Sequence, residues 1–348
     1  MHPDRDMSRL GPGLAVAAAV AAAARLAHGA LPASVAQAVG EAIIAVLFGL
    51  ILGNSVRLPA ASAPGIRFAF QTVLRVAIVL LGAGLSFAAV VAIGARALFV
   101  IVLLMTLALA AAHLLGRRFG VSSRLATLLG VGTAVCGNSA IGAVAPAIGA
   151  DDDEVAYAIA TNTLFGTVAV FAYPILGHAL GLSDAEFGSW AGTAVNDTSQ
   201  VVAAGFAYSD PAGEVATVVK LTRNSLMGAV IVAMAALHGR AHPAGGGFAA
   251  RLRQSVPWFV VGFLVMAAIR TVGGFDWIAA RAGIDVQAWL TWSARAAILL
   301  ALAGVGLSTR FAAMRRTGFA PLALGFAIAL TTATASYAWI RAVGPAAG

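Results

Sequence analysis

Apolar stretches long enough to cross a lipid bilayer recur along almost the whole chain, with only short polar loops between them. The apolar positions run continuously and do not alternate with polar ones, which favours helices over the strands of a β-barrel. The pattern predicts an all-α polytopic membrane protein with about 10–11 transmembrane segments. The predicted segments are 10–29, 36–53, 68–90, 97–115, 125–148, 155–177, 192–208, 214–237, 256–272, 288–308 and 319–341.

One polar, glycine-rich interruption occurs twice in this apolar background. GTAVCGNSAIGAVAP begins at Gly132, and GTAVNDTSQVVAAGF begins at Gly192. When the two are aligned on these glycines, Ser139 falls on Ser199, and a Glu-Val-Ala triplet further along each copy also coincides. Two matched blocks in one register indicate an internal duplication.

A shorter repeat lies outside the first. The motif Gly-x-Gly-Leu-Ser occurs at 82–86 and again at 304–308, near the ends of two spans that the predicted topology runs in opposite directions. Close helix packing through small residues would explain each motif alone, whereas inverted structural repeats would produce the antiparallel pair. We expect a single membrane domain over 1–348, in which scaffold-like parts at 36–116 and 255–342 flank a duplicated core at 122–238.

Both interruptions would make poor helices. The segment 125–148 carries several glycines and Pro146, and the segment 192–208 carries an Asn-Asp pair. Each could be a broken spanning helix or a re-entrant hairpin, and the sequence leaves both open. Unwound backbone at membrane depth is tolerated where it lines a cavity or is buried in protein. We therefore predict two discontinuous helices that face one another near the midplane, as in the substrate sites of secondary transporters.

The composition excludes a soluble domain, because 60% of the 348 residues are hydrophobic, 10% are charged and the mean hydropathy is +0.91. The net charge of +8 would suit a nucleic-acid partner, but the arginines are spread over short loops. We expect a lipid bilayer and no nucleic acid. Loops on one predicted side hold Arg5, Arg9, Arg57, Arg67, Arg117, Arg118, Arg124, Arg240, Arg251, Arg253, Arg310, Arg315 and Arg316. The other side holds only Arg25, Arg96, Arg270, Arg281 and Arg341, which predicts a cytoplasmic N-terminus.

The interruptions could bind a small anion. The N-terminus of a half-helix offers free N–H groups and the positive end of a dipole, and neutral polar side chains could orient an oxyanion. Polar packing between helices is the structural alternative. The candidate substrate-binding residues are Gly132, Thr133, Cys136, Gly137, Asn138, Ser139, Thr193, Asn196, Thr198, Ser199 and Gln200.

Three charged residues extend this site. Asp197 could carry a coupling proton or cation, or it could cap the half-helix that follows. Lys220 and Arg223 lie three residues apart, on one face of a helix. We add both to the substrate-binding set, because they could attract an anion or pair with Asp197; snorkelling to the membrane surface is the alternative.

Other chemistry finds little support in the sequence. Cys136 is the single cysteine, which excludes an internal disulfide and a multi-cysteine metal site. Nucleotide-binding, zinc-protease and serine-hydrolase motifs are absent from the sequence. We expect no cofactor, no metal and no enzymatic activity. An intramembrane enzyme using Ser139 or Cys136 as nucleophile, or a receptor that does not transport, are the less favoured alternatives.

At VGTAVCGNSAIGA, NDTSQVVAAG and VVKLTRN the chain resembles a family of bacterial inner-membrane proteins described as sulfate exporters. The resemblance runs from about residue 36 to the C-terminus. It implies an inverted-repeat transporter distantly akin to sodium/proton antiporters and bile-acid symporters, in the bacterial inner membrane. Many members carry a histidine in the block corresponding to Asn196-Asp197, and this chain does not, so coupling through a histidine is not expected.

The residues and the resemblance together predict a secondary active transporter of a small inorganic or organic anion, sulfate- or sulfite-like. We expect it to work by alternating access. The resemblance implies export, while the sequence itself leaves open the direction of transport, coupling to a proton or sodium, and assembly as a homodimer. A proton- or sodium-coupled cation antiporter is the alternative.

Overall fold

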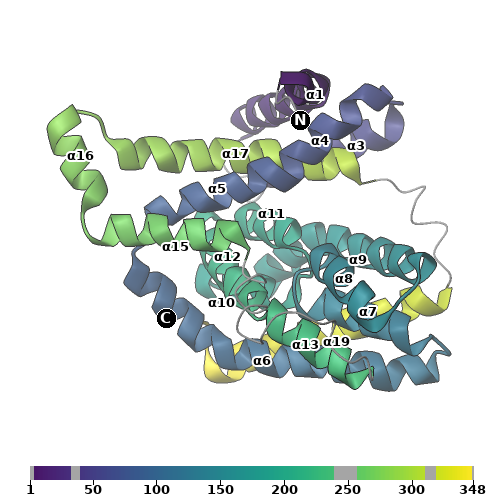
Figure 1. The fold of residues 1–348 in the computed structure, drawn as a ribbon. Coiled ribbons are helices and arrows are strands. Elements are labelled where there is room, and N and C mark those ends of the chain that lie inside the picture. The colour runs from purple at the N-terminus through teal and green to yellow at the C-terminus, as the bar shows by residue number, and fades with distance from the viewer. Residues whose placement is uncertain (1–3, 33–39, 239–256, 310–318, 347–348) are drawn as a thin grey trace. The chain divides into compact units, whose positions relative to one another are not determined.

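A computed structural model describes residues 4–32, 40–238, 257–309 and 319–346 (Figure 1). Within these ranges the secondary structure is helical and contains no strand, as the sequence predicts. Residues 36–39 of the second predicted span, and Arg240, Arg251, Arg253, Arg310, Arg315 and Arg316, lie outside them. The α-helices are α1 (Asp4–Gly29), α3 (Glu41–Ser55), α4 (Ala63–Phe68), α5 (Leu74–Leu81), α6 (Phe87–Arg118), α7 (Ser123–Ala134), α8 (Asn138–Ile148), α9 (Asp152–Ala179), α10 (Asp184–Ala194), α11 (Thr198–Tyr208), α12 (Asp210–Ser225), α13 (Met227–Leu237), α15 (Trp258–Thr271), α16 (Gly274–Ala282), α17 (Val286–Ser308) and α19 (Phe319–Val343).

Among the described residues, six stretches are long and apolar enough to cross a membrane by themselves. They are Arg9–Gly29, Ala60–Gly84, Phe87–Arg118, Asp152–Ala179, Val286–Ser308 and Phe319–Val343. Two bent pairs raise this number to eight: α12 with α13, at 41°, and α15 with α16, at 63°. The remaining predicted spans contain shorter helices, since α3 has 15 residues and the two interruptions are broken.

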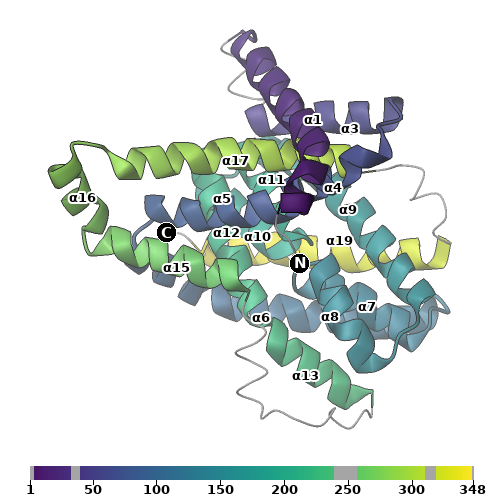
Figure 2. The same ribbon diagram turned by 45° about the horizontal axis from the view of Figure 1, so that its top comes forward.

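The helices form two compact units, and the first comprises Met1–Val91, Phe206–Ser209 and Trp258–Phe311. In this unit α17 packs against α3 and α5, and α15 packs against α5 (Figure 2). A Cβ on Gly306 would lie 2.2 Å from the Val46 carbonyl oxygen, and one on Gly82 would lie 2.4 Å from that of Phe263. One glycine of each Gly-x-Gly-Leu-Ser motif, Gly82 and Gly306, thus allows backbones to approach closely.

The second unit comprises Ala92–Gly205, Asp210–Pro257 and Ala312–Gly348, and it contains the duplicated core. Each copy of the duplication forms a short helix, a break, a second short helix and then another helix. The first copy is α7, α8 and α9, and the second is α10, α11 and α12. Helices α6 and α19, which the sequence grouped with the scaffold-like parts, fall in this unit along with the core.

Both breaks lie within the predicted interruptions. Helix α7 ends at Ala134, and α8 begins after Gly137, whose φ of +67° is a backbone conformation that favours glycine. Helix α10 ends at Ala194, and α11 begins after Asp197, which accepts hydrogen bonds from the start of α11. A glycine in one copy and a capping aspartate in the other therefore stop and restart the helix at equivalent places.

Candidate functional site

The C-terminal ends of α7 and α10 meet at Lys220, which lies in α12. The Lys220 ammonium donates to the carbonyl oxygens of Val135, at 2.8 Å, and Val195, at 3.0 Å. It also donates to the carbonyl oxygen of Asn196. Three acceptors match the three N–H groups of a protonated lysine, whereas a neutral amine has only two. Three carbonyl acceptors suit the charged form of Lys220.

Arg223 is one turn further along α12 and completes this arrangement. Its Nε donates to the carbonyl oxygen of Ala134, at 2.6 Å, and its Nη1 to that of Thr193, at 2.7 Å. Its Nη2 donates to the carbonyl oxygen of Thr133. Carbonyls at a helix C-terminus carry partial negative charge and lack partners within the helix. The two cations supply those partners for both broken helices.

Lys220 and Arg223 are 0% and 1% exposed, so neither side chain snorkels to a surface. All the hydrogen bonds that they donate go to backbone carbonyls among the described residues, and neither donates to Asp197. The direct ion pair that the sequence suggested as one possibility is thus not formed in this structure. The two cations bind carbonyl oxygens at helix ends and not the Asp197 carboxylate.

The N-terminal ends of α8 and α11 form the more accessible side of the breaks. Asp197 Oδ1 accepts from the Ser199 backbone N–H at 2.9 Å and from the Ser199 hydroxyl at 2.7 Å. The Asp197 N–H donates in turn to Gln200 Oε1 at 3.2 Å. Asp197 thus fulfils the capping role that the sequence allowed. Its Oδ2 faces Gly137, since a Cβ built there would lie 2.9 Å from it.

The start of α8 has no comparable cap, because its N-cap residue, Gly137, has no side chain to accept a hydrogen bond. A chain of amides and hydroxyls lies beside it instead. Asn162 donates to Asn138 Oδ1 at 2.9 Å, and Asn138 donates to Thr163 Oγ1 at 3.1 Å. The Oδ1 atom of Asn162 is buried without a hydrogen-bond partner among the described residues, and so is that of Asn224.

Sequence reasoning missed Asn162, Thr163 and Asn224. The first two lie in the middle of α9, and Asn224 directly follows Arg223 in α12. A side-chain amide inside an otherwise apolar span is costly in a bilayer and is usually functional. That signal was available in the sequence and would have identified Asn162 and Asn224.

Comparison with known proteins finds one family and a set of membrane proteins that are similar to this chain. A family model described as Conserved hypothetical protein 698 matches residues 12–325. The chain belongs to this family. A UPF0324 membrane protein of Agrobacterium fabrum is 36% identical over 315 residues, covering 90% of this chain and 88% of the relative. One from Clostridium tetani is 33% identical over 311 residues, covering 86% and 88%.

The UPF0324 inner membrane protein YeiH of Salmonella typhi is 30% identical over 329 residues, covering 93% of this chain and 91% of the relative. No solved structure matches the chain. These names assign the Conserved hypothetical protein 698 family to membranes and state no substrate. The protein is therefore a membrane protein of this family, and its substrate is a matter for proposal.

The breaks bring most of the predicted site residues together. The backbone carbonyls of Thr133, Thr193 and Asn196 bind the two cations, and Thr198 Oγ1 accepts from Asn224 at 3.1 Å. Others lie apart from this cluster or serve packing. Ser139 is exposed on α8 and Gly132 is buried inside α7, while the Cys136 thiol is buried and contacts Met227 Sδ at 3.5 Å. Among the described residues, no group of three His, Cys, Asp or Glu side chains could hold a metal ion.

Proposed function

We propose that this protein is a secondary active transporter that moves a small oxyanion, of the sulfate or sulfite class, by alternating access. The observation that carries the proposal is the charge placed at the two breaks. Lys220 and Arg223 occupy the C-terminal ends of the half-helices, and Asp197 occupies an N-terminal end. Each of these charges lies at a helix end of opposite polarity.

The sum of these charges favours an anion. Each helix end contributes roughly half an elementary charge, so two C-terminal and two N-terminal ends cancel to about zero. The ionised side chains then contribute two positive charges and one negative, which leaves an excess of about one positive charge. Uncompensated charge in a low-dielectric interior is costly, so a bound anion would stabilise the site. A cation there would increase the imbalance.

The uncapped start of α8 supplies the donors. Backbone N–H groups in the first turn of a helix lack internal partners and point along the axis, which suits a tetrahedral or pyramidal oxyanion. Asn138 and Thr163 stand beside that turn and could orient the ligand. Asp197 approaches the same turn at Gly137, so its protonation would strengthen anion binding there. This links anion movement to a proton, and Asp197 is the proposed coupling residue.

The proposal can be tested by flux of labelled sulfate, and separately sulfite, into proteoliposomes across an imposed pH gradient. The wild type should show saturable flux that the gradient drives. Asp197→Asn keeps the shape of the residue and removes its charge. We expect this variant to retain anion exchange and to lose the response to the gradient.

Asp151→Asn is the matched control, because Asp151 also caps a helix, α9, by accepting from the Glu154 N–H, and it is exposed. Its flux should equal that of the wild type. Folded protein that carries neither anion would contradict the proposal. Proton- or sodium-coupled cation flux without any anion requirement would instead identify the antiporter alternative.

A further inference from the structure

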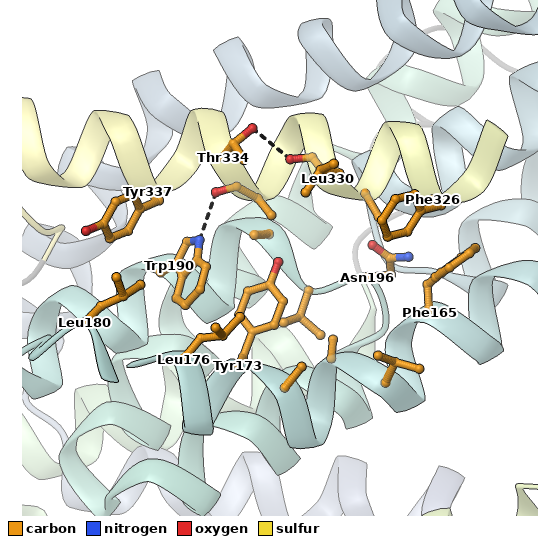
Figure 3. Close-up of a pocket in the computed structure, with 17 residues that line it drawn as sticks. Phe165, Tyr173, Leu176, Leu180, Trp190, Asn196, Phe326, Leu330, Thr334 and Tyr337 are labelled. Carbon is orange, nitrogen blue, oxygen red and sulfur yellow. Dashed lines mark hydrogen bonds between the residues drawn. The ribbon is translucent and has the colours of Figure 1, made fainter. Parts of the chain in front are cut away.

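A cavity of about 350 Å³ lies between α9, α10 and α19, within the second unit (Figure 3). Its walls carry five aromatic side chains: Phe165, Tyr173, Trp190, Phe326 and Tyr337. The Tyr173 and Trp190 rings lie 4.3 Å apart, and Trp190 lies 5.9 Å from Tyr337. Such walls would bind an apolar molecule by burying its surface.

The mouth of this cavity is apolar as well. Leu176 on α9 is 47% exposed, and Phe326 and Leu330 on α19 are 54% and 50% exposed. Helices α9 and α19 both have the length and hydropathy of membrane spans. None of the lining side chains carries a charge. A ligand would therefore enter this cavity from the hydrocarbon region of the bilayer.

Two polar groups line the cavity without hydrogen-bond partners in the part of the chain that the structure describes. They are the side-chain amide of Asn196, a residue only 5% exposed, and the hydroxyl of Tyr173. Figure 3 shows the Tyr173 hydroxyl directed into the space between α9 and α19. The indole N–H of Trp190, by contrast, donates to the Ala333 carbonyl at 2.9 Å. Because both groups line the cavity, a ligand inside it could hydrogen-bond to the Asn196 amide and the Tyr173 hydroxyl.

The inner end of the cavity is next to the buried cations. The carbonyl oxygen of Asn196 accepts a hydrogen bond from Lys220. A negatively charged head group at this end would therefore be attracted by the positive excess at the breaks, and the Asn196 amide and Tyr173 hydroxyl could donate to it.

We propose that this cavity binds a single-chain amphiphile with an oxyanion head, of the fatty-acid class. Its hydrocarbon chain lies among the aromatic rings, and its carboxylate accepts from Asn196 and Tyr173. The ligand comes from the bilayer, and it contacts the same residue, Asn196, whose backbone holds Lys220. This second site is separate from the uncapped turn of α8, so its test does not depend on the proposed transport activity.

The test uses the full-length protein in phospholipid nanodiscs, with dodecanoic acid brominated on its chain as the probe. Bromine quenches tryptophan fluorescence at contact, and Trp190 lines the cavity. We expect saturable quenching that Trp190→Phe removes. The alcohol of the same chain length, also brominated, should bind at least tenfold more weakly, because it lacks the charge that strengthens the hydrogen bonds at the head.

Two variants distinguish binding of the ligand's carboxylate head from binding of its hydrocarbon chain. Asn196→Ala should weaken the acid by tenfold or more and the alcohol by a smaller factor, because the hydrogen bond to the alcohol is not strengthened by charge; the bond to Lys220 uses the backbone of Asn196, so it survives this substitution. Ala329→Phe fills the cavity and should abolish saturable quenching. Its matched control is Ala338→Phe, at an exposed position of the same helix that does not line the cavity.

Equal binding of acid and alcohol, or no change in Asn196→Ala, would overturn the assignment of the head group. Quenching that survives Ala329→Phe would overturn the site itself. Quenching by phospholipid brominated on its acyl chains, with none by the free acid, would show that ordinary lipid tails fill the cavity, which also contradicts the proposal.

Discussion

Replacing Lys220 by methionine tests whether this lysine stabilises the ends of the broken helices or binds the substrate. Methionine has a similar length and no donor. The substitution leaves three backbone carbonyls, those of Val135, Val195 and Asn196, without the ammonium that now binds them. All three lie at the ends of broken helices in the interior of the second unit, and Lys220 itself is 0% exposed.

The expected loss of unfolding free energy follows from the number of carbonyls left without a donor. A buried acceptor left without its partner costs about 1–3 kcal/mol, so three of them cost roughly 3–9 kcal/mol. A typical protein has a free energy of unfolding of about 5–15 kcal/mol. The substitution should therefore remove a large part of the stability, with or without substrate. The substitution also removes the cost of burying the lysine charge, which offsets part of this loss. Methionine nevertheless donates no hydrogen bond to the three carbonyls.

The measurement is equilibrium unfolding of the purified protein in mixed micelles, followed by circular dichroism, with and without sulfate. Thr222→Val is the control on α12, because the Thr222 hydroxyl donates only within its own helix, to the Val218 carbonyl. It should cost less than about 1 kcal/mol. If Lys220→Met unfolds with the same free energy as the wild type and loses only the stabilisation by sulfate, the lysine serves the anion and the assignment to the helix ends is wrong.

Four further predictions concern single residues. Three of these residues lie near the breaks, and one lies at the start of α10. Gly137→Ala should lower the free energy of unfolding by at least 1–2 kcal/mol, because the left-handed backbone disfavours Cβ and the new atom would lie 2.9 Å from a carboxylate and an amide. Gly142→Ala, on a helix with open space around it, should be neutral or stabilising in the same denaturation assay. The Cys136 thiol should react with maleimide only after unfolding, since it is 6% exposed; rapid labelling of native protein would contradict the buried break. Glu186 has a pKa lowered from 4.5 chiefly because the Ser183 backbone N–H donates to it. Its stabilising effect is therefore present above pH 4.5 and is lost as the pH falls through the lowered pKa, so Glu186→Gln should be less stable than the wild type at pH 7 and equal to it in strong acid.

The class of fold and the position of the breaks could be predicted from the sequence because both depend on local chemistry. Long apolar runs require helices in a membrane, and Gly137 and Asp197 are residue types that favour helix boundaries. The duplication was visible as well, since its two copies keep a common register. Asp197 as a helix cap was one of the two interpretations that the sequence allowed.

The partners of Lys220 and Arg223 could not be predicted in the same way. Their spacing places both on one face of α12, but their acceptors are backbone carbonyls, which carry no sequence signature. The bond from Lys220 to Val135 joins residues 85 positions apart, and that from Arg223 to Ala134 joins residues 89 apart. The aromatic cavity was missed for a similar reason, since Tyr173, Trp190 and Tyr337 come from three separate helices. Only the folded chain shows that they converge.

The position of the two cations also has a consequence for biosynthesis. The carbonyls at residues 133–135 precede their donors in α12 by 85–90 residues, and those at residues 193–196 precede them by 24–30 residues. The first break is therefore synthesised well before Lys220 and Arg223, and the second only shortly before them. Lys220 is the single lysine of the chain, so no other lysine can replace it at the first break during that interval. The C-terminal ends of both broken helices would then gain their hydrogen bonds from α12 at almost the same time, once residues 220–223 have been inserted. A nascent chain stalled before that point should keep its interruptions hydrated and be recognised by membrane proteases, and release of α12 should end that susceptibility in both copies of the duplication.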